Sequence, residues 1–210
     1  MSQTNDPAAV AKSLRRYKPL APIVKIVGPP PVQRRRAPAT RYPYLVRSIV
    51  YQQLAGSAAN AIHGRLVAGC GGTVSASAID HLSEDELATF GLSGAKRAAI
   101  RDLTEHVDRG DVRLDLHGRW DNDAVMEDLV KVRGIGPWTV QMYLMSSLGR
   151  PDVWPTGDLG VRYGWSLLHG LDPVISPREL ELAGEPLAPH RSAVAWYCWE
   201  AVGLFRSKSG

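Results

Sequence analysis

Residues 132–144, VRGIGPWTVQMYL, decide the fold, because two glycines and a proline separate two segments that have the apolar spacing of helices. The first segment predicts a helix over 121–133, which Gly134 ends in the left-handed conformation common at helix C-termini. Pro137 suits the first position of the next helix, where a missing N–H costs no intrahelical hydrogen bond. We therefore predict a helical hairpin over 121–149.

The glycines of this hairpin point to an anion site. Glycine permits the turn and leaves room for another backbone to approach. The N–H groups that begin the second helix lack intrahelical acceptors, and the helix dipole adds partial positive charge there. A DNA phosphate fits this arrangement, and the residues expected to hold it are Gly134, Gly136, Trp138 and Thr139. An ordinary connection between two helices is the alternative.

The remaining sequence predicts further helices and no convincing sheet, so the fold class is all-α. Helices are predicted over 44–67 with a break near 55–57, then over 83–90, 91–107, 158–169 and 190–204. Ser83 precedes three acidic residues, which is the composition of a helix N-cap and first turn. The alternation of apolar residues in 112–116 is only a weak signal of extended structure.

Length and composition exclude several classes of protein. The chain has 210 residues, enough for one domain or two small interlocked lobes. Its two cysteines, Cys70 and Cys198, exclude a four-cysteine zinc or iron–sulfur site and fit a reducing compartment. No apolar run approaches the length of a membrane span, and the first residues lack a signal-peptide core. We expect a cytoplasmic protein with no membrane partner.

Positive charge is concentrated near the N-terminus. The net charge is +4, and nine lysines and arginines lie between Lys12 and Arg41 with no acidic residue among them. A polyanion such as nucleic acid is a plausible partner for this region. The alternative is a solvated arm, and residues 1–18 are expected to form a flexible basic tail.

Four stretches, in this order, carry a resemblance to a known family. They are RSIVYQQLAGSAANAIHGRL (47–66), LVKVRGIGPWTVQ (129–141), RPDVWPTGDLGVRYG (150–164) and PHRSAVAWYCW (189–199). Together they resemble the helix-hairpin-helix DNA glycosylase superfamily, in its 3-methyladenine DNA glycosylase II branch. The resemblance covers about 19–205 and fits the short form that lacks an N-terminal sheet domain.

The resemblance implies a particular domain organisation. It implies two interlocked helical lobes, with a helix-hairpin-helix DNA-binding motif and an active-site cleft between the lobes. One lobe would span about 42–149, and the second would combine 19–41 with 150–205. Residues 206–210 would form a tail.

The resemblance also implies an activity, with Asp158 as the catalytic residue. Such enzymes flip a damaged base out of the duplex and hydrolyse its N-glycosidic bond. A carboxylate beside C1′ stabilises the oxocarbenium-like sugar and can orient or deprotonate water. The sequence alone leaves a second role open, because an aspartate in TGDLG (156–160) can simply cap the following helix.

The resemblance also implies which residues form the base pocket and the DNA wedge. Alkylated purines are cationic, so a pocket of electron-rich rings gains a cation–π contribution of about 0.5–2 kcal/mol. The pocket residues implied are Trp138, Trp199, Met142 and Trp154. The branch has a tyrosine where this chain has Met142, which puts its substrate range in question. Gln53, with Leu54 beside it, maps to the wedge. The alternative for the tryptophans is that they are core residues, and the alternative for Gln53 is that it simply ends a helix.

The hairpin also bears on mechanism and cofactors. Bifunctional relatives carry a lysine where this chain has Trp138, and Lys131 lies before the turn. We therefore expect a monofunctional enzyme that uses water and has no lyase activity. No cofactor is expected, although the resemblance allows a Na⁺ or K⁺ ion on the carbonyls of Val130, Val132 and Ile135.

The expected partner is double-stranded DNA with damaged bases, bound by a monomer with no obligate protein partner. In a bacterial-type cell this binding would place the protein at the nucleoid. Two other functions remain open. One is a non-catalytic helix-hairpin-helix DNA-binding protein, which would not need the TGDLG loop. The other is a monofunctional glycosylase for other damaged or mismatched bases.

Overall fold

The computed structural model describes residues 6–32 and 34–209, and within these residues helices are the only regular secondary structure, with no strand. The all-α fold class is therefore confirmed. The chain divides into two compact units. Unit 1 comprises Met1–Arg34 and Gly149–Gly210, and unit 2 comprises Arg35–Leu148. None of the described helices is both long and apolar enough to cross a bilayer.

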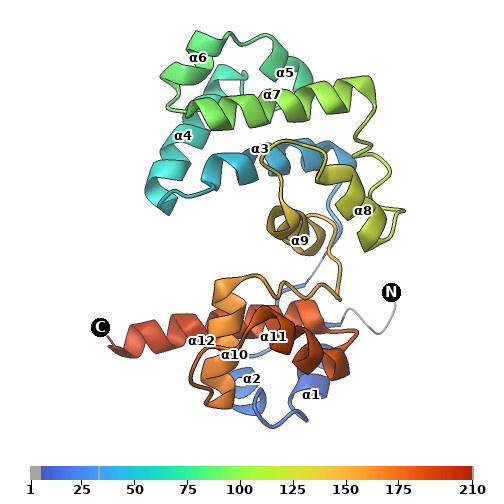
Figure 1. Ribbon diagram of the computed structural model, residues 1–210, viewed down its shortest axis with the longest axis vertical. Helices are drawn as coiled ribbons and strands as arrows, with labels where there is room; N and C mark the ends of the chain where they lie inside the picture. The colour runs from blue at the N-terminus through green and yellow to red at the C-terminus, as the bar shows by residue number, and fades with distance from the viewer. Residues whose placement is uncertain (1–5, 33, 210) are drawn as a thin grey trace. The chain divides into compact units, whose positions relative to one another are not determined.

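Unit 2 is built around α3 (Arg41–Tyr51), which follows the short 3-10 turn η2 (Pro38–Thr40). Helix α3 packs against α4 (Gly56–Gly69), α7 (Gly94–Arg109) and α9 (Pro137–Ser146). Figure 1 shows α7 on one side of α3 and α9 on the other. The side chains with essentially no exposed surface in this core include Leu45, Ile49, Leu66, Ile100, Leu103, Leu129 and Tyr143.

Two short helices, α5 (Ala76–Asp80) and α6 (Glu84–Thr89), pack on α7. The N-cap predicted at Ser83 is confirmed, because its Oγ accepts the Glu86 N–H at 3.2 Å. The Glu86 carboxylate in turn accepts the Ser83 N–H at 2.7 Å, completing a capping box. Residues 114–116 form a turn and residue 112 a bend, so the segment 112–116 contains no strand.

The predicted hairpin is present, but its first helix is shorter than expected. Helix α8 (Asn122–Leu129) begins after the Asp121 cap and ends at Leu129, so the predicted extent of 121–133 is wrong at its C-terminal end. Val132 continues the helical spacing, yet it lies in the turn that joins α8 to α9. Gly134 has the left-handed conformation predicted for it, with φ of 77°.

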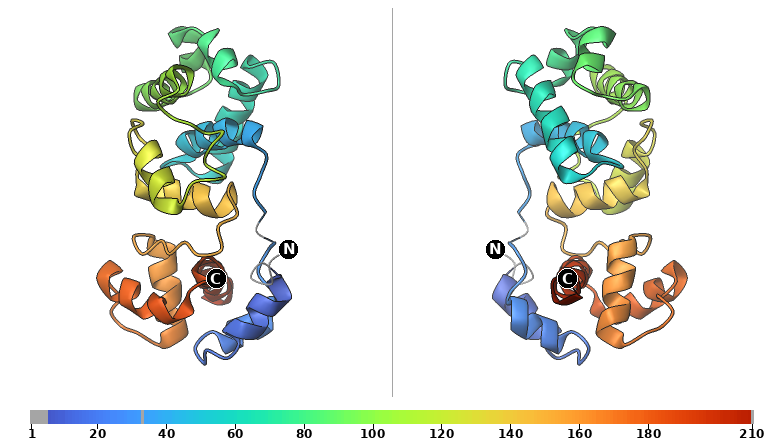
Figure 2. Two further views of the ribbon diagram at one scale, coloured as in Figure 1. Left: turned by 90° about the vertical axis from the view of Figure 1, so that its right-hand side faces the viewer. Right: turned by 90° about the vertical axis from the view of Figure 1, so that its left-hand side faces the viewer.

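Unit 1 is built on the pair α10 (Leu159–His169) and α12 (Arg191–Ser209). In Figure 2, α12 lies between α10 and the helices α1 (Pro7–Leu14) and α2 (Ala21–Val27). A Cβ added at Gly164 of α10 would lie 2.0 Å from the Cys198 carbonyl oxygen of α12. Only glycine therefore allows these two helices to approach so closely.

Two expectations for unit 1 are corrected, and one helix is added to those predicted. The predicted tail over 1–18 contains α1, whose residues Val10, Ala11 and Leu14 are buried; residues 1–5 lie outside the described residues. The predicted tail over 206–210 is helical as far as Ser209, and residue 210 is not described. The sequence also missed α11 (Pro177–Gly184) and the 3-10 turn η3 (Glu185–Leu187) that follows it.

Candidate DNA-binding and catalytic residues

The N-terminus of α9 is the candidate phosphate site in unit 2. Gly136 occupies the N-cap and supplies no side-chain cap, and Pro137 follows at the first helical position. A Cβ added at Gly136 would meet no heavy atom within 4 Å, so the approach to this helix end is open. Thr139, in the first turn of α9, is buried and lines the cavity described below. A helix N-terminus of this kind favours an anion.

Two side chains that the sequence did not single out hold the turn of the hairpin. Asp102 of α7 accepts the Arg133 N–H at 2.7 Å, and the Gln52 side chain donates to the Gly134 carbonyl oxygen at 2.9 Å. Ala99 closes the third side, because its Cβ lies 3.2 Å from where a Cβ at Gly134 would be. Asp102 and Gln52 lie far in sequence from the residues that they hold, so no local motif marks them.

The turn between α3 and α4 carries the two wedge candidates. Gln53 has φ of 57°, the only positive φ of a non-glycine residue among the described residues. A left-handed conformation is uncommon for such residues and marks positions where structure has been constrained, often at functional sites. Gln53 and its neighbour Leu54 are both exposed at this turn.

A cavity of about 460 Å³ in unit 2 brings together several residues predicted from the sequence. Gln53, Trp138 and Met142 all line it, and Trp138 is 49% exposed. Tyr44 of α3 also lines the cavity, although no sequence motif marks it as a site residue. The Tyr44 hydroxyl donates to the Met142 carbonyl oxygen at 3.1 Å. The lining of the cavity therefore combines aromatic rings with polar side chains.

A buried polar network lies beneath the hairpin. His117 has no exposed surface, and its Nε2 lies 2.8 Å from an Asp128 carboxylate oxygen on α8. Its Nδ1 lies 3.0 Å from the Tyr143 hydroxyl on α9. Because a carboxylate only accepts, Nε2 carries the proton and the Tyr143 hydroxyl donates to Nδ1. Burial lowers the pKa of His117, which the Asp128 carboxylate opposes, so the imidazole is held neutral between the two helices.

In unit 1, Asp158 is fixed by two hydrogen bonds to the same oxygen. It is the N-cap of α10, and its Oδ1 accepts the Val161 N–H at 2.7 Å. The same Oδ1 accepts the indole N–H of Trp199 from α12 at 3.0 Å. The capping role left open by the sequence is therefore real. Capping fixes the orientation of the carboxylate and does not by itself exclude a chemical role.

The loop that leads to Asp158 is tied to the start of α12. The Arg191 guanidinium donates to both carboxylate oxygens of Asp152, each at 2.7 Å. These hydrogen bonds hold the pKa of Asp152 below its ordinary value. Ser192 adds two links, because its hydroxyl donates to the Arg150 carbonyl oxygen and accepts the Val153 N–H. Residues 150–153 are thus anchored close to the catalytic candidate.

Trp154 takes the core position that the sequence had left open for it. It is 6% exposed, and its indole N–H donates to the Leu180 carbonyl oxygen at 2.9 Å. Its ring meets Trp165 edge to face, with centroids 5.7 Å apart. This buried position within unit 1 supports α10 and α11 and offers no ring face to a base.

The hairpin carbonyls remain candidates for a monovalent cation. The Val132 carbonyl oxygen accepts the Ile135 N–H at 3.1 Å, which still leaves it a second lone pair. Oxygen donors of this type suit a hard cation. Elsewhere in the described residues, no group of three histidine, cysteine or acidic side chains is arranged to hold a metal.

Comparison with known proteins places these features in a family. Residues 46–189 match the HhH-GPD superfamily of base excision DNA repair proteins. DNA-3-methyladenine glycosylase 1 of Schizosaccharomyces pombe is 32% identical over 185 residues, which cover 87% of this chain and 81% of the relative.

Two solved structures are similar along most of the chain. The first is the S. pombe 3-methyladenine DNA glycosylase in complex with abasic DNA, which has a TM-score of 0.82, 30% identity, and coverage of 91% of this chain and 95% of that one. The second is a DNA-3-methyladenine glycosidase from Bacillus halodurans, with a TM-score of 0.83, 32% identity, and coverage of 98% and 93%. From the matched residues and these relatives together, we conclude that the chain belongs to the HhH-GPD superfamily of base excision DNA repair proteins.

Proposed function

We propose that the protein is a DNA glycosylase that excises alkylated purines, of the 3-methyladenine and 7-methylguanine type, from double-stranded DNA. The observation that carries the proposal is the placement of Asp158, whose Oδ1 is fixed by the Val161 and Trp199 N–H groups. The names of the relatives support the same substrate class. Asp158 is the proposed catalytic residue.

The proposed chemistry needs one carboxylate and one water. As the C1′–N bond breaks, its electron pair leaves with the base, so a cationic alkylpurine departs as a neutral molecule. The sugar becomes oxocarbenium-like, and the Asp158 carboxylate stabilises that charge. The oxygen of a water molecule then bonds to C1′, and the water's proton passes to the carboxylate or to solvent.

Recognition of the base is assigned to aromatic and soft side chains. In unit 2, Trp138 offers an exposed ring, with Met142 and Tyr44 lining the same cavity. In unit 1, Trp199 is a second proposed stacking residue, and its N–H also positions Asp158. A cationic base gains more from these rings than a neutral base does.

Binding of DNA is assigned to two elements of unit 2. The hairpin residues Gly134 and Gly136 with the start of α9 are proposed to hold a backbone phosphate. Gln53 and Leu54 are proposed to enter the space that the flipped base leaves, which offsets part of the few kcal/mol that flipping costs. A monovalent cation on the Val130, Val132 and Ile135 carbonyls would strengthen the phosphate site.

The enzyme is proposed to be monofunctional. A lyase needs an amine that attacks C1′ and forms a Schiff base. The position that carries lysine in bifunctional relatives is Trp138, whose indole cannot act in this way. Borohydride added during the reaction should trap no covalent protein–DNA adduct, and a trapped adduct would overturn this assignment.

An excision assay tests the proposal. Duplexes carrying 3-methyladenine, 7-methylguanine, hypoxanthine or 1,N6-ethenoadenine are incubated with the protein, and released base is measured. We expect release of the two alkylated purines, and loss of at least about 100-fold in rate for Asp158→Asn. Asp85→Asn, an exposed acid in the first turn of α6, is the matched control and should retain full activity.

The same assay separates the other two functions. A non-catalytic DNA-binding protein would bind these duplexes and release no base, and Asp158→Asn would not change its binding. A glycosylase for other damaged bases would release hypoxanthine or ethenoadenine and leave the methylated purines in place. Either result would overturn the proposed substrate class.

A further inference from the structure

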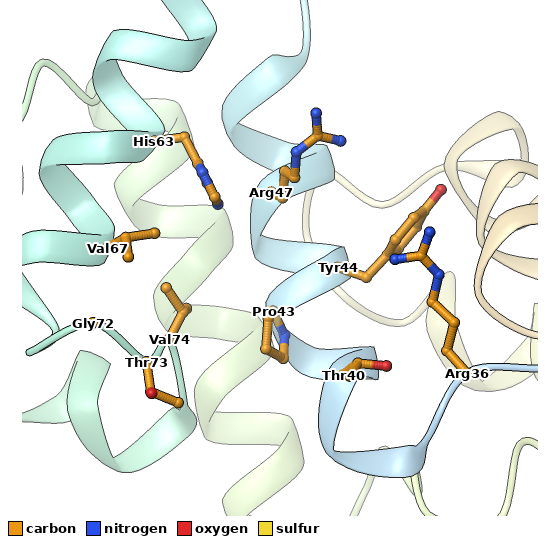
Figure 3. A pocket seen from close by; sticks show the side chains of 10 residues that line it. All are labelled: Arg36, Thr40, Pro43, Tyr44, Arg47, His63, Val67, Gly72, Thr73 and Val74. Atoms are coloured by element: carbon orange, nitrogen blue, oxygen red, sulfur yellow. The ribbon is translucent and has the colours of Figure 1, made fainter.

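Unit 2 contains a second cavity, of about 560 Å³, that the proposed chemistry does not use. Its lining comes from α3, α4 and the segment at 72–74, with Arg36 from the chain before α3 (Figure 3). Pro43, Val67 and Val74 form an apolar part of the lining. The cavity is therefore open to a ligand that has both an apolar body and a polar group.

The charged side chains of the lining are the two arginines Arg36 and Arg47. Arg36, Arg47 and His63 line the cavity, and none of its lining residues is acidic. The ion pairs among the described residues include neither arginine. In Figure 3, the His63 ring extends from α4 toward α3, which carries Arg47.

Two other arginines near Arg36 in the sequence bind backbone carbonyls instead of lining the cavity. Arg35 and Arg41, on either side of Arg36, each donate from the guanidinium to backbone carbonyls, of Gly118 and Leu114 respectively. Arg47 instead stacks on the Tyr51 ring, with its guanidinium carbon 4.1 Å from the ring centroid. A guanidinium stacked on a ring can still donate hydrogen bonds from the N–H groups at its edge. Phosphate oxygens are commonly bound by such in-plane N–H groups.

A nearby positive charge disfavours the protonated form of an imidazole and so lowers its pKa. Burial lowers the pKa of His63, and the positive charge of Arg47 lowers it further. An anion in the cavity would reverse this effect by offsetting the charge of both arginines. The hydroxyls of Thr40 and Thr73, which also line the cavity, are additional donors for anion oxygens.

We propose that this cavity binds a phosphate group, with Arg36 and Arg47 as its cationic contacts and His63 in the same lining. Tyr44 and Arg47 also line the cavity that holds Trp138, so the two cavities share part of their walls along α3. A phosphate of the DNA backbone is therefore the favoured source, and this choice of source rests on the proposed function. A free nucleotide is the other source of the same group.

Nuclear magnetic resonance of the His63 ring, assigned with a His63→Gln variant, provides the test on the whole chain. Three probes are titrated: inorganic phosphate, 2′-deoxyadenosine 5′-monophosphate and an undamaged duplex. We expect the His63 pKa to rise when the cavity is filled. A response to the duplex alone identifies the DNA backbone as the source, and a response to the mononucleotide identifies a free nucleotide.

Duplex affinity at several salt concentrations gives a second readout. Arg36→Gln should reduce the slope of log affinity against log salt by about one, as expected for one lost phosphate contact. Arg109→Gln is the control, because it removes the same charge from an exposed residue paired with Glu105 at the end of α7.

The proposal is overturned if no probe changes the His63 pKa, or if Arg36→Gln and Arg109→Gln behave alike toward every probe. Neither measurement requires base release. If the protein excises alkylpurines normally while no probe changes the His63 pKa, only the proposed phosphate site is contradicted. A protein that fills the cavity yet releases no base would contradict only the proposed function.

Discussion

The Gln52 side-chain amide lies 2.9 Å from the Gly134 carbonyl oxygen and donates a hydrogen bond to it. This bond joins the turn that carries Gln53 and Leu54 to the hairpin that carries the proposed phosphate site. The neighbouring Arg133 N–H is held by Asp102 of α7 at 2.7 Å, so the tip of the hairpin is restrained both by α7 and by the turn between α3 and α4. Gln52 thereby links the proposed phosphate site to the proposed wedge.

Replacing Gln52 by leucine keeps the side-chain size and removes the donor. A neutral hydrogen bond contributes about 0.5–1.5 kcal/mol, so we expect excision from a stable duplex to slow by about 2- to 10-fold. If Gln52 acts by holding the wedge, the loss should be smaller when the lesion lies opposite an abasic site and flips more easily. Single-turnover rates on both substrates measure this difference.

Unfolding of the Gln52→Leu variant by urea is the control for that experiment. Similar midpoints for the variant and the parent would show that the fold survives. An equal loss of rate on both substrates would mean that Gln52 does not act through the wedge.

Trp199→Phe separates the two roles proposed for Trp199. Phenylalanine keeps a ring for stacking but cannot donate to Asp158 Oδ1. Hydrogen bonds to charged groups contribute about 1.5–3 kcal/mol, so the maximal rate of excision should fall by about 10- to 100-fold. The affinity for abasic DNA, measured separately, should change little.

Trp196→Phe is the matched control, since Trp196 lies on the same helix and its ring meets Tyr197. It should leave the rate of excision close to that of the parent. If Trp199→Phe weakened DNA binding and left the chemical step unchanged, the indole N–H would have no part in positioning Asp158.

Much of the fold was predictable because its signals are local. Apolar spacing and cap residues predicted the helix pair that surrounds the α3–α4 turn, the Ser83 cap and the hairpin. Each of these depends on residues within a few positions of one another. Helix α1 was not predicted because its buried apolar positions, Val10, Ala11 and Leu14, are few and the helix has only eight residues.

The candidate site was predictable only in part, for a physical reason. Asp158, Trp138 and Gln53 belong to contiguous motifs, whereas Gln52, Asp102 and Tyr44 act on residues 82, 31 and 98 positions away. Long-range hydrogen bonds leave no periodic pattern in a single sequence. The error at the end of α8 has the opposite origin, because a local pattern continued through residues that tertiary contacts place in a turn.

Met142→Tyr tests the proposed base cavity. Met142 lines the cavity with Trp138, and its backbone carbonyl, which accepts from Tyr44, is unaffected by the change. A tyrosine ring is larger and less adaptable than a thioether chain, so the cavity should shrink. We expect excision of 1,N6-ethenoadenine to fall relative to that of 3-methyladenine. An unchanged ratio of the two rates would place Met142 away from the base.

His117 makes stability depend on pH in a defined direction. Burial lowers its pKa below the value of about 6.5 expected in the unfolded chain, so the unfolded state binds the proton more readily. The neutral imidazole therefore stabilises the fold fully above about pH 6.5, and this contribution is lost as pH falls toward the lowered pKa. The free energy of unfolding, measured by urea titration between pH 8 and 5, should decline on the acidic side.

His117→Gln identifies how much of that decline belongs to His117. Glutamine retains polar atoms but has no proton to gain, and one buried contact to Asp128 or Tyr143 should be lost. We expect the variant to be less stable by about 1–3 kcal/mol at pH 7 and to show a shallower decline toward pH 5. Burial also lowers the pKa of His63 and His169, so a residual slope should remain. Parallel curves for variant and parent would show that the pKa of His117 is the same in the folded and the unfolded chain, because a group whose proton affinity is equal in both states cannot produce a slope.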